Sequence, residues 1–170
     1  MKNLKINNDN FYRSFNVCES KDLKEIKELI DLEYAKGNIV WTHPLYQTWS
    51  NLHDKLKHVS SFNRLKNKII NLVKDINKDL KLTTCWCNLS VENNYYVFHQ
   101  HKTKLTCVFY LHSKEESYGL RLEEHNIIFP AVENSVVIFD GGIAHSIEHM
   151  PNKVFDSVLS HRYSVVFDFI

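Results

Sequence analysis

Three of the ten histidines have the spacing of a transition-metal site. His99 and His101 are separated by one residue, so on an extended strand both imidazoles point to one face. His145 follows 44 residues later, after an apolar run and a Gly-Gly turn, where a distant strand could deliver a third ligand. Imidazole nitrogens bind such metals at about 2.1 Å. Taken alone, the His-x-His pair is as consistent with two histidines in the core or on the surface as with a metal site. The third histidine, His145, makes the metal site the stronger hypothesis.

A second group of polar residues lies on two of the predicted strands. Arg162 and Ser164 are two residues apart and share one strand face. A guanidinium directed into a barrel needs an anion, and a carboxylate held by two parallel hydrogen bonds matches it best. Trp86 and Asn88 share a face of the strand before the histidine pair, so Asn88 is a candidate contact to the metal ligands or to a ligand bound beside the metal.

Two amphipathic helices are predicted before these strands. Apolar residues recur through 23–32, with Ser20 as a predicted N-cap and Gly37 as a predicted terminator. A second helical pattern has apolar residues at spacings of three and four through 62–80. These helices are expected to support the rest of the domain.

The sequence pattern changes from helical to extended after Thr83. Short runs rich in Val, Ile, Phe and Tyr are separated by polar turns, as at 105–111, 135–139 and 163–169. The 170 residues therefore predict a single α+β domain, in which 1–82 form a mainly helical support and 83–170 form a β-sandwich or barrel core.

Composition narrows the class of protein. The chain has 21 basic and 20 acidic residues, which argues against a polyelectrolyte that binds nucleic acid or a polybasic membrane anchor. The first 82 residues have a net charge of +5 and the remaining residues a net charge of −4, so the two halves are expected to have different functions.

Other features of the composition exclude further classes of protein. The chain has four glycines and no glycine-rich phosphate-binding motif, and no apolar run is long enough for a signal peptide or a membrane span. Reduced cysteines in a cytoplasmic protein fit best, because Cys85 and Cys87 are too close for an ordinary disulfide within one strand.

The motifs, taken in order, resemble the iron(II)- and 2-oxoglutarate-dependent oxygenases, above all their prolyl-hydroxylase-like branch. The resemblance covers about residues 83–170 and implies a double-stranded β-helix, or jelly-roll, core with the N-terminal helices packed on it. The landmarks in sequence order are His99-Gln100-His101, 105–111, 119–122, Pro130 before 136–139, His145 and Arg162-Tyr163-Ser164.

The resemblance assigns roles to these residues. It implies that His99 and His145 hold Fe(II), that Arg162 pairs with the distal carboxylate of 2-oxoglutarate, and that Tyr110 and Ser164 add hydrogen bonds to this co-substrate. It also implies a hydroxylase that uses molecular oxygen, with ascorbate as a further reductant. The substrate, a small molecule or a peptidyl residue, is not implied.

The third metal ligand departs from the family pattern. The family's first motif is His-x-Asp or His-x-Glu, but this chain has His101 at that position. Some phage and bacterial members of the superfamily resemble this chain in having His-x-His there, so the resemblance implies His101 as the third ligand. A third neutral imidazole makes the centre more positive and favours Cu(II), Ni(II) and Zn(II) over Fe(II). Asp140, Glu148 and Glu92 are the alternative carboxylate ligands.

Two other functions compete with the oxygenase. A cupin-like metal-binding protein or dioxygenase that does not use 2-oxoglutarate would explain the histidines, but it would leave Arg162 without a role. A non-enzymatic β-sandwich interaction protein would have incidental histidines and bind no metal.

Overall fold

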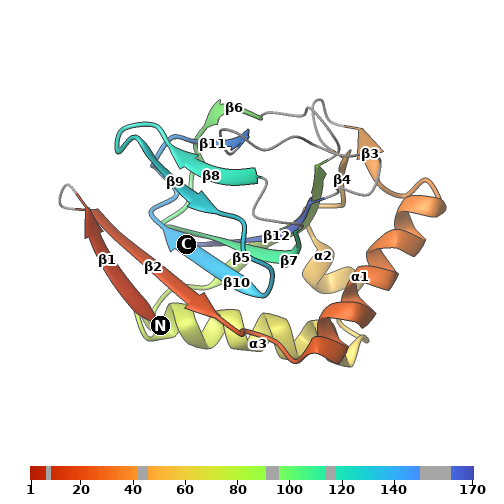
Figure 1. Cartoon of the computed structure of the whole chain (residues 1–170). Helices are drawn as coiled ribbons and strands as arrows, with labels where there is room; N and C mark the ends of the chain where they lie inside the picture. The colour runs from red at the N-terminus through yellow and green to blue at the C-terminus, as the bar shows by residue number, and fades with distance from the viewer. Residues whose placement is uncertain (7–8, 42–45, 91–95, 114–117, 150–161) are drawn as a thin grey trace.

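The chain folds into three layers (Figure 1). The computed structural model describes residues 1–6, 9–41, 46–90, 96–113, 118–149 and 162–170. Within these ranges, three helices cover an eight-stranded sheet, and a four-stranded sheet lies on its other side. The two facing sheets form a double-stranded β-helix core, which confirms the predicted α+β fold.

The larger sheet has the strand order β1-β2-β10-β7-β12-β5-β4-β3, and each neighbouring pair is antiparallel. The smaller sheet has the order β6-β11-β8-β9 and is also antiparallel. The larger sheet comprises β1 (Lys2–Ile6), β2 (Asp9–Phe15), β3 (Val40–Trp41), β4 (Tyr46–Gln47), β5 (Leu82–Ser90), β7 (Leu105–His112), β10 (Ser135–Phe139) and β12 (Arg162–Phe169). The smaller sheet comprises β6 (Tyr96–His99), β8 (Tyr118–Leu122), β9 (Ile127–Pro130) and β11 (His145–His149).

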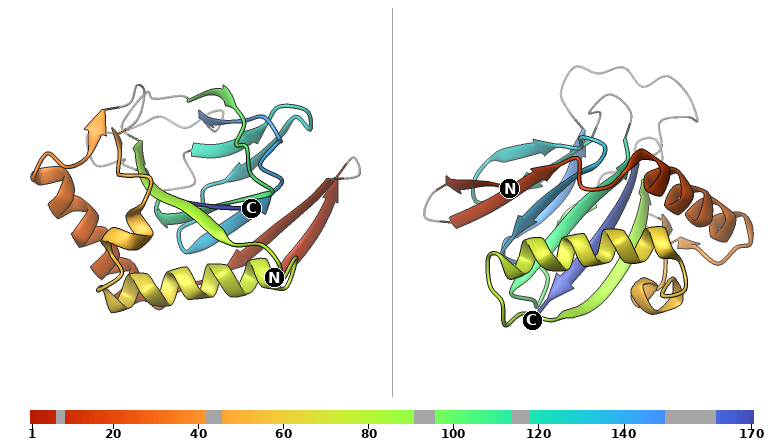
Figure 2. Two further views of the ribbon diagram at one scale, coloured as in Figure 1. Left: turned by 180° about the vertical axis from the view of Figure 1, so that it is seen from behind. Right: turned by 90° about the horizontal axis from the view of Figure 1, so that it is seen from below.

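The helices pack on the outer face of the larger sheet, and α3 runs across its strands (Figure 2). They are α1 (Ser20–Ala35), α2 (Leu52–Lys55) and α3 (Ser60–Lys74). Ser20 is the first helical residue and Glu19 occupies the N-cap position, so the predicted cap is displaced by one residue. Gly37 has a φ of +74° just after α1, as a terminating glycine should. No helix in the described ranges is long and apolar enough to cross a membrane.

The first 82 residues contribute strands as well as helices. β2 pairs with β10 and β4 pairs with β5, so segments from the N-terminal half extend the larger sheet on both sides. The β2 pattern is hard to recognise in the sequence, because Phe11 is the single fully buried residue in a strand that is otherwise partly or wholly exposed.

β12 is buried on both faces, and its alternation separates an apolar side from a polar one. Its odd-numbered residues, from Tyr163 to Phe169, join the core beneath the helices. Arg162, Ser164 and Asp168 lie on the opposite face, toward the smaller sheet, because side chains alternate along a strand. The sheet therefore places polar groups in the interior between the two β-layers.

An ion pair joins α1 to α3 outside this interior. The buried Asp22 carboxylate accepts hydrogen bonds from Arg64 Nε at 2.9 Å and Arg64 Nη2 at 2.6 Å. We expect Asp22→Asn to lower the Tm by roughly 2–4 °C at neutral pH, a shift appropriate to the loss of one modest interaction in a domain of this size.

The Asp22 effect should depend on pH. The hydrogen bonds from Arg64 lower the pKa of Asp22 below its usual value of 3.8. The carboxylate therefore stabilises the folded state above that value, and this contribution is lost as the pH falls through the lowered folded-state pKa. Thermal denaturation at neutral pH and near pH 3 should show a smaller difference between wild type and variant at acid pH. An equal Tm for the two proteins at neutral pH would contradict the assignment.

Candidate active site

The three predicted histidines converge in the interior. His99 ends β6, His145 begins β11, and the two are directly paired across these strands with ring centroids 4.3 Å apart. The His101 ring lies 5.2 Å from that of His99 and 5.0 Å from that of His145. One nitrogen from each imidazole lies within 4.8 Å of the other two. The structure thus brings together the three side chains that the sequence singled out.

His101 is positioned differently from the sequence prediction, which placed it on the same strand as His99. β6 ends at His99, so His101 is not on the strand and strand alternation does not orient it. Its backbone N–H instead donates a hydrogen bond of 2.8 Å to the carbonyl of Gly141, in the turn that leads to β11. The turn before His145 therefore anchors both the segment carrying His101 and the strand carrying His145.

His145 is held in a tautomer that leaves one ring nitrogen available as a neutral ligand. Its Nδ1 lies 2.9 Å from the carbonyl oxygen of Ile143, so an Nδ1–H can donate to that carbonyl and leave the Nε2 lone pair available. Burial lowers the pKa of His145 to about 3, and the neighbouring His99 and His101 act in the same direction. At neutral pH the ring is therefore uncharged, which is the form that binds metals.

A carboxylate that sequence analysis missed lies beside His101. Asp168 Oδ1 and Oδ2 are 2.9 and 3.0 Å from His101 Nδ1, and Thr106 Oγ1 donates to Asp168 Oδ1 at 2.7 Å. Asp168 is buried. The sequence does contain an indication of this role. Asp168 is an acidic residue in an otherwise apolar strand, and strand alternation places it on the same face as Arg162 and Ser164.

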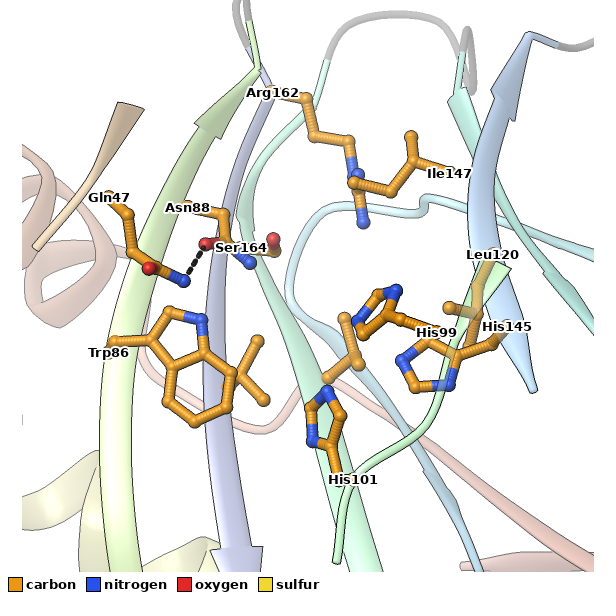
Figure 3. A pocket seen from close by; sticks show the side chains of 12 residues that line it. Gln47, Trp86, Asn88, His99, His101, Leu120, His145, Ile147, Arg162 and Ser164 are labelled. Atoms are coloured by element: carbon orange, nitrogen blue, oxygen red, sulfur yellow. Dashed lines mark hydrogen bonds between the residues drawn. The ribbon is translucent and has the colours of Figure 1, made fainter. Parts of the chain in front are cut away.

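Arg162 lies at the other end of the pocket from His101 (Figure 3). Its side chain is 1% exposed, and its Cζ lies 5.0 Å from the centre of the Tyr110 ring. Asn88 and Ser164 lie between these ends on neighbouring strands, in register with each other. Gln47, from β4, donates a hydrogen bond of 3.1 Å to Asn88 Oδ1. This contact orients the Asn88 amide. Gln47 belongs to the polar, aromatic segment 46–52, a candidate from the sequence for the lining of a substrate cleft, and it lines the pocket.

These groups surround one cavity of about 140 Å³ between the two sheets. Its described lining contains one guanidinium and three imidazoles but no carboxylate, so it favours an anionic ligand. Ser164 Oγ and Trp86 Nε1 are buried without a hydrogen-bond partner among the described residues. The lining residues are Gln47, Trp86, Asn88, His99, His101, Val108, Leu120, His145, Ile147, Arg162, Ser164 and Val166.

Other candidate residues have different positions. Tyr110 is fully buried beneath Arg162 and is not among the residues that line the cavity. Asp140 is exposed, and its Oδ1 accepts a hydrogen bond of 2.7 Å from the Gly142 N–H, so it stabilises the turn and is not part of the histidine cluster. Glu92 and the side chain of Glu148 lie outside the described part of the structure.

The buried cysteines lie on the opposite face of the larger sheet from this cavity. Cys85 and Cys87 pack in the core beneath the helices. Burial raises the pKa of Cys87 to about 12 and that of Cys85 well above its usual value. Both thiols are free and protonated, which fits a structural role.

Gly141 is required at its position by a close contact. A Cβ on Gly141 would lie 2.7 Å from the carbonyl oxygen of Thr103 and would also collide with the Thr103 hydroxyl. We expect Gly141→Ala to displace the segment carrying His101, to destabilise the fold by about 1–3 kcal/mol, and to weaken metal binding. Chemical denaturation and zinc titration measure the two effects. Gly37→Ala is the matched control: it introduces backbone strain in open space, so zinc affinity equal to that of wild type is expected there.

Comparisons with known proteins identify the architecture. No protein-family model and no curated protein matches the chain. Among solved structures, a prolyl hydroxylase from Trichoplax adhaerens in complex with a hypoxia inducible factor peptide fragment matches with a TM-score of 0.71 and 12% identity, over 94% of this chain and 82% of that one. HygX from Streptomyces hygroscopicus, with nickel and 2-oxoglutarate bound, matches with a TM-score of 0.71 and 10% identity, over 94% and 82%. The alpha ketoglutarate dependent epimerase SnoN matches with a TM-score of 0.71 and 13% identity, over 95% and 78%.

These matches define a class of fold. The chain has the double-stranded β-helix fold of the iron(II)- and 2-oxoglutarate-dependent oxygenases, with a triad-like cluster of three histidines inside it. The matched proteins include a hydroxylase and an epimerase, so the fold does not select one reaction.

Proposed function

We propose that this protein is an Fe(II)- and 2-oxoglutarate-dependent oxygenase that hydroxylates its substrate. The observation that carries the proposal is the arrangement of one pocket, with three convergent imidazoles near one end and the buried guanidinium of Arg162 at the other. A metal-chelating 2-oxoacid with a second carboxylate at its far end is a ligand of matching chemistry. We propose hydroxylation as the outcome because it is the reaction of the prolyl hydroxylases among the structural matches.

The residues present fit both implied groups. His101 and His145 each have Nδ1 within hydrogen-bond distance of an oxygen, which leaves Nε2 as the ligand atom. The cavity is lined by cationic and neutral groups, and unpartnered donors at Ser164 and Trp86 point to a ligand that accepts hydrogen bonds. Three neutral imidazoles would also hold Ni(II) or Zn(II), so the metal present in a purified sample is not by itself the working metal.

The chain's own residues would divide the tasks of the reaction. Together, Fe(II) and 2-oxoglutarate supply the oxidising chemistry that activates molecular oxygen. His99, His101 and His145 would hold the metal on one side and leave its other positions open. Arg162 would bind the distal carboxylate through its planar fork and so orient the co-substrate.

The walls of the pocket would protect this chemistry from water. Val108, Leu120, Ile147 and Val166 line the cavity and come from both sheets. An apolar wall lowers the local dielectric and strengthens the ion pair that Arg162 would form with a carboxylate. It also excludes water that would compete for the open metal positions.

The decisive experiment is an anaerobic titration of the metal-free protein with Fe(II) and then with 2-oxoglutarate. We expect the visible charge-transfer band of a chelated iron–ketoacid complex, and we expect its loss in His99→Ala. Oxygen consumption and succinate release would then serve as readouts in a search for the substrate. Tight metal binding without the band would favour the cupin-like alternative, and the absence of metal binding would favour a non-enzymatic interaction protein.

A further inference from the structure

Asp168 is the one carboxylate that contacts a histidine of the metal cluster in the described part of the chain. Both of its oxygens are within 3.0 Å of His101 Nδ1. Thr106 donates to Oδ1, and Thr84 Oγ1 lies 3.4 Å from Oδ2. The three residues are brought together by the pairing of β12 with β5 and β7, which places Asp168 opposite both Thr84 and Thr106. The carboxylate is therefore held in a fixed orientation at the edge of the metal cluster.

The position of this charge matters because the metal ligands are neutral. Three neutral imidazoles bring no negative charge to a divalent metal ion. A set of two imidazoles and one carboxylate brings one negative charge. A carboxylate that accepts the N–H of a ligating imidazole fixes the tautomer and makes the other nitrogen more basic. The buried position of Asp168 keeps this interaction strong, because little water screens it.

We propose that Asp168 is a positioning residue that holds His101 as the Nδ1–H tautomer and supplies, from behind this ligand, the negative charge that the three-histidine cluster lacks. The inference rests on the proposed metal site and deepens it. Among the described residues, a carboxylate thus lies close to the metal site but behind an imidazole, where it contacts the ligand and does not take a coordination position. His101 then ligates through Nε2 with Asp168 as its hydrogen-bond acceptor.

The test compares zinc affinity, which involves no redox chemistry and no turnover. Asp168→Asn keeps the size of the side chain and an oxygen acceptor for His101 but removes the charge. We expect the zinc dissociation constant, measured by competition with a chromophoric chelator, to rise about 10- to 100-fold. Asp22→Asn is the matched control, because it removes another buried carboxylate, in the α1–α3 ion pair, and should leave zinc affinity unchanged.

A second measurement uses the wild-type protein and does not depend on the folding of a variant. Nitrogen-15 NMR of the imidazoles in the zinc-loaded protein should show His101 protonated at Nδ1 and bound through Nε2. A His101 bound through Nδ1, or unchanged zinc affinity in a folded Asp168→Asn protein, would overturn the inference while leaving the metal site intact. Failure of the wild-type protein to bind zinc or iron at all would overturn both the inference and the proposed function.

Discussion

His145→Ala will lose stoichiometric binding of divalent metal, with the metal dissociation constant raised by more than about 100-fold. His145 is buried, faces His99 directly across β6 and β11, and has its Nδ1 beside the Ile143 carbonyl. No other described residue is placed to supply its nitrogen to the cluster. Removing a ligand should cost more than removing a group behind a ligand, which typically costs 10- to 100-fold in affinity. Metal content after gel filtration and a zinc competition titration measure the loss.

The control for this variant is a histidine elsewhere in the fold. His112 Nδ1 contacts Glu133 Oε2 at 2.7 Å at the C-terminal end of β7, away from the cluster. His112→Ala should bind metal as tightly as wild type. Circular dichroism should show that His145→Ala is folded, since the surrounding apolar core remains in place. Full metal occupancy in a folded His145→Ala protein would remove His145 from the site.

Arg162→Lys will bind 2-oxoglutarate about 10- to 100-fold more weakly than wild type but will keep its metal. An ammonium group cannot form the two parallel hydrogen bonds that a guanidinium makes to a carboxylate, and one lost bond to a charged group corresponds to about 1.5–3 kcal/mol. Arg162 lies at the end of the pocket away from His101, so metal affinity should not change (Figure 3). Titration of the charge-transfer band with 2-oxoglutarate, together with zinc affinity, separates the two effects.

The same substitution outside the pocket provides the matched control. Arg64→Lys also changes an arginine that holds a carboxylate, Asp22, but this pair joins α1 to α3. It should affect thermal stability and leave 2-oxoglutarate affinity unchanged. Wild-type 2-oxoglutarate affinity in Arg162→Lys would show that this guanidinium does not bind the co-substrate.

The secondary structure was largely readable because local periodicity determines it. The apolar stripes of α1 and α3 follow the helical period of 3.6, and the nearly continuous runs of apolar and aromatic residues in β7, β10 and β12 are typical of strands buried on both faces. β2 was missed because it lies next to the edge strand β1 and Phe11 is its one buried residue, so its apolar pattern is weak.

The sequence by itself determined the chemistry of the site: three imidazoles with ligand spacing, and a guanidinium and a hydroxyl that share a strand face as Arg162 and Ser164. Only the tertiary structure decided which groups meet. Asp168 contacts His101 across 67 residues of sequence, and Gln47 contacts Asn88 across 41. Such contacts are set by the order and register in which β12, β5, β7 and β4 pair, and a pairing partner leaves no periodic signal within one strand. The tertiary structure also placed Asp140 in an exposed turn, and it brought His101, not that carboxylate, to His99 and His145 by anchoring the His101 N–H on the Gly141 carbonyl.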